Sequence, residues 1–257
     1  MSDTMIAVGI DLAVQASKTG VCVLRKDSDG KTYAYFDSRR NDEDLAALIY
    51  KAWEAKPRVP VAIDVPLGWS PKFRDFLQDP SSEESKALLQ HHRKDYRYID
   101  LRLRQADQDL HGHLHEVLPK PTNWGANKVP SPLSASTDKL GAATMRWFAI
   151  RAAMKDTNAA DHVLETYPAA ARYVWEWPDR KHLGDDVEAL IRDDVSWDPS
   201  RRQQDPYKAT EHERDALVAS LVARLDVGER RGFPGKEFPS GEGCIWIPEK
   251  KSKPPCD

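Results

Sequence analysis

Four acidic residues stand out in the sequence, and three of them lie in segments whose other residues are mostly apolar. Asp11 and Asp64 each come near the end of an apolar segment with strand character, and Glu165 lies within a third such segment. Asp215 lies near the start of the last helix that the sequence predicts. A charge inside an apolar element costs several kcal/mol unless a partner compensates it. These four acids are therefore the first candidates for a functional site.

The carboxyl ends of strands in an open α/β sheet form the edge where ligands usually bind. We therefore expect the four acids to surround one cleft. Such a cluster repels itself unless a cation lies within it, and Mg²⁺ or Mn²⁺ prefers oxygen ligands of this kind. Two such ions activate a water molecule and stabilise the leaving oxygen of a phosphodiester. Asp11, Asp64, Glu165 and Asp215 are thus the candidate catalytic and metal-binding residues.

Each acid also has a purely structural alternative. Asp64 can cap the turn before Pro66, and Asp215 can pair with Arg214 or with a neighbouring lysine. For a single acid these explanations carry as much weight as the functional one. The functional explanation gains its strength from all four acids occurring together.

Histidines add two further candidates. His212 precedes Asp215 by three residues, so both lie on one helix face, where His212 can bind metal, polarise a substrate phosphate or remain a solvated residue at the helix start. The run His111–His115 lacks the fixed second ligand pair of a zinc motif, so a solvated helix end is the preferred interpretation.

The composition describes a soluble globular protein. The chain has 257 residues, a formal net charge of −3, 40% hydrophobic and 31% charged residues, which favours neither disorder nor membrane insertion. Three widely spaced cysteines without a CxxC pair indicate a reducing cytosol. No signal peptide or membrane span is predicted, so we expect a cytoplasmic protein. The near-neutral charge disfavours tight nonspecific coating of DNA.

The apolar pattern predicts an α/β fold in one domain over residues 1–248, with a loose tail over 249–257. A helical insertion is expected over about 82–154, broken by the Pro-containing stretch 119–132. The predicted strands are Met5–Ala13, Gly20–Leu24, Lys31–Phe36, Val59–Val65 and Val163–Tyr167, with a possible edge strand at Cys244–Ile247. The other predicted helices are one that Asn41 caps, one over Ala169–Trp177, and the last over Glu211–Val227.

Several sequence blocks together resemble one known family. The blocks are GIDLA, AIDVPLGW, YRYID, PLSASTDKLG followed by Met145-Arg146, ETYPAA, and Tyr207-Lys208 ahead of HERDA. In this order they resemble the family called domain of unknown function 429, from about Met5 to Pro248. The resemblance implies a predicted nuclease with a ribonuclease H-like fold, built on a mixed five-stranded sheet with flanking helices. It implies an acidic site on Asp11, Asp64 and Asp215, with Glu165 as a fourth member.

The same resemblance implies a set of substrate-binding residues. An Arg-x-Thr-Asp segment of the family falls on Arg97 and Asp100, where Ile99 replaces the usual threonine. Arginine and lysine near carboxylates are suited to holding phosphate oxygens. The implied substrate-binding residues are Arg97, Asp100, Ser134, Ser136, Asp138, Arg146 and Lys208, beside His212.

Three functions are compatible with the sequence. The leading hypothesis is a metal-dependent phosphodiesterase that acts on a nucleic acid or a nucleotide. An actin-like ATPase or kinase is an alternative, because Lys18–Gly20 and Asp64–Gly68 are also similar to phosphate-binding turns, but a second lobe and a late Gly-rich turn are not evident. The third is a non-catalytic binding module with an acidic groove. The eight tryptophans can stack on bases, although such residues more often lie in cores.

Overall fold

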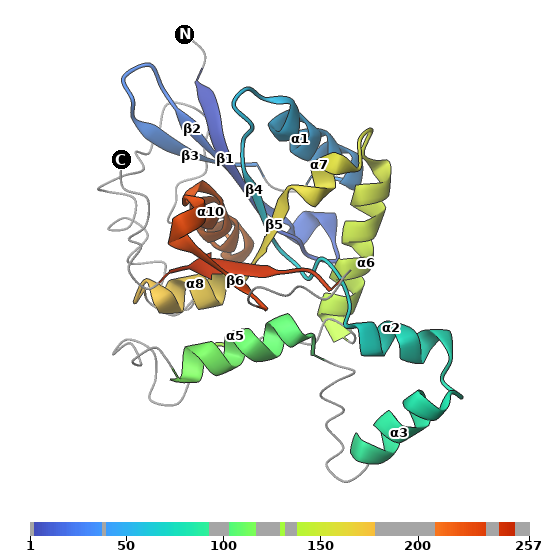
Figure 1. Ribbon diagram of the computed structural model, residues 1–257. Helices are drawn as coiled ribbons and strands as arrows, with labels where there is room; N and C mark the ends of the chain where they lie inside the picture. The colour runs from blue at the N-terminus through green and yellow to red at the C-terminus, as the bar shows by residue number, and fades with distance from the viewer. Residues whose placement is uncertain are drawn as a thin grey trace.

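The chain is built around one mixed β-sheet (Figure 1). The structure is a computed structural model that describes residues 3–37, 40–92, 103–116, 129–131, 138–177, 209–234 and 242–249. Its seven strands have the order β3-β2-β1-β4-β5-β7-β6. Their bounds are β1 Thr4–Asp11, β2 Gly20–Lys26, β3 Thr32–Phe36, β4 Val61–Asp64, β5 Val163–Thr166, β6 Arg230–Phe233 and β7 Ile245–Pro248.

The first part of the sheet follows directly from the local sequence. Strands β1, β2 and β3 form antiparallel pairs, and Gly30, with a φ of 85°, allows the tight turn between β2 and β3. Strand β4 pairs in parallel with β1, and β5 pairs in parallel with β4. The five predicted strand segments are therefore all present, with their ends shifted by a few residues.

The predicted sheet of five strands is wrong in its strand number. Strand β7 pairs in parallel with β5, and β6 then pairs antiparallel with β7, so the segment predicted as an edge strand is an interior strand. Strand β6 has the sequence RRGF, which lacks the apolar alternation that identifies a strand. Tertiary pairing with β7 therefore determines its conformation.

Helices cover both faces of the sheet (Figure 1). One face carries α1 (Asp42–Glu54), α6 (Asp138–Ala153) and the short α7 (Asn158–Asp161), which share an apolar core with the sheet. The other face carries α10 (Glu211–Arg224) and α8 (Pro168–Val174). The side chain of Asn41 caps α1, and Thr210 forms a capping box with Glu213 at the start of α10.

Most of the described residues in the region predicted as a helical insertion are helical. This region contains α3 (Glu83–His92), α5 (Gln105–Glu116) and α6, while α2 (Pro71–Gln78) precedes it. Helix α6 belongs to the core, because Trp147 and Ile150 are both buried beneath α1. Among the described residues, no helix has the length and apolar character that crossing a membrane requires.

Candidate functional site

Asp11 and Asp64 lie next to each other at the carboxyl edge of the sheet. They are the last residues of β1 and β4, and they are register partners on these two parallel strands. Neighbouring strands lie about 4.8 Å apart, and paired positions direct their side chains to the same face. Asp11 is buried and Asp64 is half-buried. The structure thus brings these two carboxylates together.

Helix α10 lies directly against the same face because two glycines allow a close approach. A Cβ atom on Gly9 would lie 1.9 Å from the backbone oxygen of Ala216, and one on Gly20 would lie 2.1 Å from the backbone oxygen of His212. Any side chain at either position would therefore push the helix away. The close contact places the first turn of α10 over the end of β1.

This placement joins α10 to the first carboxylate. The Nδ1 atom of His212 lies 2.7 Å from Oδ2 of Asp11. Asp215 lies one helical turn further along the helix, on the same face as His212. The site residues Asp11, Asp64, His212 and Asp215 thus come from two strands and one helix that meet at one sheet edge.

Asp215 has a buried partner that the sequence analysis did not anticipate. Its Oδ1 atom accepts a hydrogen bond and forms an ion pair with Nη1 of Arg172 in α8, and both side chains are buried. The expected structural partner was Arg214, the neighbour in sequence. The only sequence signal for Arg172 is a single arginine within the otherwise apolar segment PAAARYV.

Tyr167 lies near both Asp64 and Asp215. Burial raises the pKa of its phenol, and the negative charges of Asp64 and Asp215 add to this effect while Arg172 opposes it. The phenol donates a hydrogen bond of 3.1 Å to the backbone oxygen of Ser131. Tyr167 is thus a further neutral donor beside the acidic edge, and sequence analysis did not select it.

Glu165 is separated from the other three acids by the alternation of the strand. Its register partner on β4 is Ile63, so Glu165 lies on the face of Ile63 and not on that of Asp64. Ile63 belongs to the core beneath α1 and α6. The structure therefore corrects the expectation that all four acids surround one cleft.

Glu165 instead belongs to a buried network around Arg104. Its Oε2 atom accepts hydrogen bonds from Nη1 of Arg104 at 2.8 Å and from the backbone nitrogen of Leu67 at 2.9 Å. Arg104 also binds both carboxylate oxygens of Asp107 and the backbone oxygen of Glu242. Burial raises the pKa of Glu165, and Arg104 opposes this rise. Two carboxylates thus share one buried guanidinium group.

The described acidic residues do not form a complete set of metal ligands. Among the described residues, no group of three or more His, Cys, Asp and Glu side chains is placed to hold a metal ion. His111 and His115 form only a pair, with their Nε2 atoms 3.2 Å apart. A metal ion at the carboxyl edge would therefore depend on Asp11 and Asp64 together with oxygens of a substrate.

Arg146, which the resemblance implied as a phosphate-binding residue, is bound to the protein itself. Its guanidinium group donates to Oδ1 of Asp42 at 2.7 Å, to the backbone oxygen of Ala13 and to Oγ1 of Thr19, both at 2.6 Å. These contacts join the loop after Asp11 to the start of α1. In this structure, Arg146 thus holds the loop that follows the first carboxylate.

Most of the other implied substrate-binding residues lie outside the described residues. Those outside are Arg97, Asp100, Ser134, Ser136 and Lys208. Asp138 begins α6, but the structure does not describe its side chain.

Two kinds of environment are found among the tryptophans. Trp147, Trp175 and Trp177 are buried in the core. Trp69 stacks on Phe148 with ring centroids 5.1 Å apart. In the first three, burial leaves no ring face for a nucleic-acid base.

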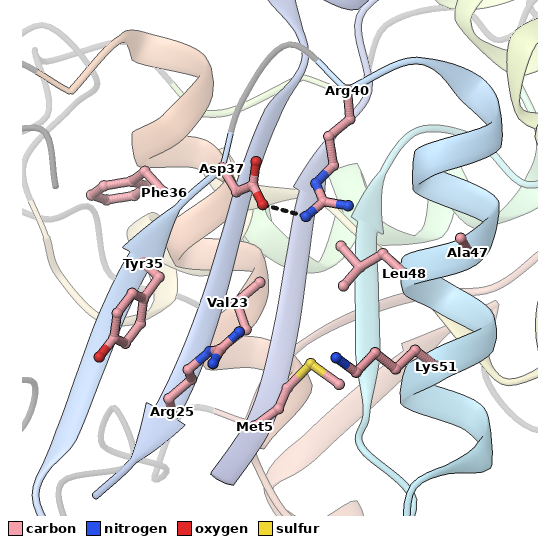
Figure 2. Close-up of a pocket in the computed structure, with 10 residues that line it drawn as sticks. All are labelled: Met5, Val23, Arg25, Tyr35, Phe36, Asp37, Arg40, Ala47, Leu48 and Lys51. Carbon is pink, nitrogen blue, oxygen red and sulfur yellow. Dashed lines mark hydrogen bonds and ion pairs between the residues drawn. The ribbon is translucent and has the colours of Figure 1, made fainter. Parts of the chain in front are cut away.

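A basic groove of about 420 Å³ lies between β3 and α1 (Figure 2). Arg25, Arg40 and Lys51 reach into it over an apolar floor, and Asp37, which pairs with Arg40, is the one acid among the residues that line it. The groove begins beside the carboxyl edge. The backbone nitrogen of Asp37 donates to the backbone oxygen of Val21, which pairs with Ile10 next to the end of β1. We call this feature the basic groove.

The fold and the site together define a mixed α/β protein with an acidic carboxyl edge and an adjacent basic groove. The chain belongs to the family described as protein of unknown function (DUF429), which matches residues 9–238. No curated protein and no solved structure matches the chain.

Proposed function

We propose that the protein is a metal-dependent phosphodiesterase of the ribonuclease H-like type, acting on a strand of nucleic acid. The observation that carries the proposal is the pairing of Asp11 with Asp64 on adjacent parallel strands, against which α10 places His212 and Asp215. Three antiparallel strands followed by parallel strands, with the last long helix over the first strand, support the ribonuclease H-like arrangement that the family resemblance implies.

The donor set fits a magnesium or manganese ion. Mg²⁺ retains several waters and is commonly bound by one or two carboxylates together with substrate phosphates. Asp11 and Asp64 are two such hard oxygen donors, side by side at the carboxyl edge. When bound, the ion would supply charge neutralisation and an activated water.

The surrounding residues orient the carboxylates at this edge and compensate part of their charge. The contact with His212 fixes the orientation of Asp11, and Arg146 holds the loop that follows it. Arg172 compensates the charge of Asp215, which reduces the repulsion that an incoming phosphate would meet at this edge. Tyr167 supplies a hydroxyl group that is protonated at neutral pH, as is usual for tyrosine, and burial raises its pKa further.

The basic groove suits the phosphates of a single strand that leaves this edge. Its cations extend along β2 from Arg40, which lies next to the carboxyl edge, to Arg25. Arg25 is four residues further along β2 than Val21, and four residues of a strand span about 13 Å. The Nε atoms of Arg25 and Arg40 are buried and have no hydrogen-bond partner among the described residues. Such donors favour an anionic ligand.

The proposal is tested by a metal-dependent cleavage screen. Single-stranded, duplex and branched DNA, RNA and free nucleotides are incubated with the protein in Mg²⁺, in Mn²⁺ and in EDTA. Cleavage of a single strand in the presence of either metal, and its loss in EDTA, is the expected result. If no substrate is cleaved, the non-catalytic binding module becomes the better account.

A divalent ion should raise the melting temperature. An ion that binds only the folded protein stabilises it by RT ln(1 + [L]/Kd), which is about 2.7 kcal/mol at 100 times Kd. We expect Mn²⁺ or Mg²⁺ to give a concentration-dependent rise in Tm by calorimetry, and Asp64→Asn to remove it. A rise of the same size in Asp64→Asn would place the ion elsewhere.

Removing two groove cations should weaken single-strand binding in a salt-dependent way. Each phosphate contact contributes about −0.7 to the slope of log K against log[salt] for single strands. The double variant Arg25→Gln/Lys51→Gln should therefore flatten this slope by about 1.4, measured by fluorescence anisotropy with a labelled oligonucleotide. Lys155→Gln, which removes an exposed charge outside the groove, is the control. An unchanged slope in the double variant would show that the groove does not bind the strand.

A further inference from the structure

A second basic cavity lies at the starts of β4 and β5, at the other end of β4 from Asp64. It has a volume of about 260 Å³, and α1, the residues leading into β4 and β5, and the first residue of β6 line it. Its walls are largely apolar and include Pro60 and Leu164, while its polar lining consists of Arg58, His162 and Arg230 together with the indole of Trp53. No acidic residue is among the residues that line it.

Arg58 is held at the rim by an aromatic stack. Its guanidinium carbon lies 3.3 Å from the centroid of the Trp53 ring, and the other partner of that ring is His162, with ring centroids 4.2 Å apart and an angle of 22° between the planes. A guanidinium group stacked on an aromatic ring keeps its N–H donors at the edge of the stack, because the ring occupies only its face. Arg58 is thus oriented without using its hydrogen-bond donors.

Arg230 is the second arginine that lines the cavity, and part of its guanidinium group is buried. Its Nε and Nη1 atoms are buried and have no hydrogen-bond partner among the residues that the structure describes. Its guanidinium carbon lies 6.0 Å from the centroid of the Trp246 ring, at the outer limit of a cation–π contact. Buried donors without partners are rare, and they commonly mark the position of an ion or ligand.

The charges around Arg230 are unbalanced. Burial lowers its pKa, and the negative charge of Asp226 opposes this only in part. Two arginines therefore line one small cavity without a carboxylate among its lining residues. A desolvated cation without a counter-charge is costly, so an anion in the cavity would stabilise the folded protein.

We propose that this cavity binds a small oxyanion that carries an apolar group, such as a phosphate monoester or a carboxylate. Arg58 and Arg230 bind the oxygens, and the walls around Pro60 and Leu164 receive the apolar group. Guanidinium groups match both anions through paired N–H donors. The volume is below the range of about 300–1,000 Å³ typical of sites for drug-sized ligands, so the ligand is small. This site is independent of the carboxylate edge.

Phenyl phosphate, inorganic phosphate and benzoate are the probes, each compared with sodium chloride at equal ionic strength. We expect phenyl phosphate to bind with a Kd of about 1 mM. A calorimetric titration that reaches about 10 mM, about ten times this Kd, should detect the binding. Inorganic phosphate should bind more weakly because it lacks the apolar group. The benzoate titration shows which of the two anions the site prefers.

Two variants and two controls locate the site. Arg58→Gln and Arg230→Met should each weaken binding by about tenfold or more, equal to about 1.4 kcal/mol for one charge-assisted contact. Arg230→Met should not lower the Tm of the ligand-free protein, because it removes a desolvated charge that Asp226 compensates only in part. Lys155→Gln and Asp64→Asn should bind phenyl phosphate as the wild type does.

Several results would overturn the proposal. Failure of the wild type to bind any probe would show that water satisfies the arginines. Unchanged affinity in both arginine variants, or an altered affinity in Asp64→Asn, would place the anion at another site. Equal affinity for inorganic and phenyl phosphate would exclude a role for the apolar walls.

Discussion

Replacing Asp64 by asparagine should abolish metal-dependent cleavage while leaving the fold and substrate binding intact. The change deletes one of the two paired hard oxygen donors, and we expect turnover to fall at least about 1,000-fold, equal to about 4 kcal/mol of transition-state stabilisation. Asp11→Asn should have the same effect. Binding of a single strand should stay the same or become tighter, because each variant removes a negative charge that repels phosphate.

The comparison needs a matched control for loss of one acidic charge. Asp75→Asn changes an exposed aspartate on α2 that is not one of the site residues, and it should cleave as the wild type does. Single-turnover rates are measured beside anisotropy binding curves for all four proteins. Cleavage by Asp64→Asn at the wild-type rate would refute the assignment of this edge as the active site.

Replacing Arg104 by methionine should cause the largest loss of stability among the changes considered. Arg104 is buried and binds Glu165 and Asp107, which are buried as well. Removing one partner from a buried ion pair leaves uncompensated charge and costs about 3–5 kcal/mol. For a chain of this size, about 2–4 °C of Tm accompany each kcal/mol, so urea unfolding and calorimetry should both detect the change.

The loss in Arg104→Met should shrink as the pH falls. Burial already raises the pKa of Glu165 in the presence of Arg104, and without the arginine the hydrogen bond from the backbone nitrogen of Leu67 is left to oppose that rise. A carboxyl group whose pKa is raised by folding contributes stability that is present below its unfolded pKa and is lost as the pH rises through its folded pKa. The variant should therefore approach the wild type near the unfolded pKa of about 4.3 and differ most at neutral pH.

Two further variants separate this network from surface charge effects. Adding Glu165→Gln to Arg104→Met should recover part of the lost stability, because it removes one of the orphaned charges. Arg151→Met, which breaks the exposed pair with Asp161, should change the free energy of unfolding by no more than about 1 kcal/mol. A small, pH-independent loss in Arg104→Met would show that the buried pair is not a major stabilising feature.

The placement of Asp11 and Asp64 could be predicted from the sequence because it depends on local information. Each acid closes a short apolar segment, and such segments form strands whose ends are set by the residues that follow. Parallel pairing then brings the two carboxyl ends to one edge, which is a general property of α/β sheets. The position of α10 over β1 has a local signal as well, in Gly9 and Gly20, although neither glycine identifies the helix that approaches it.

Only the tertiary structure decided which acids act together. Glu165 and Arg104 are 61 residues apart, and Arg172 and Asp215 are 43 residues apart, so no local pattern pairs them. The register of β5 against β4 then placed Glu165 on the face opposite Asp64. A shift by one residue in a strand reverses the face of every side chain, and long-range packing rather than local propensity sets that register. For the same reason, the apolar periodicity predicted the strands and helices of this protein, whereas the partners of its buried charges emerged only when those elements packed together.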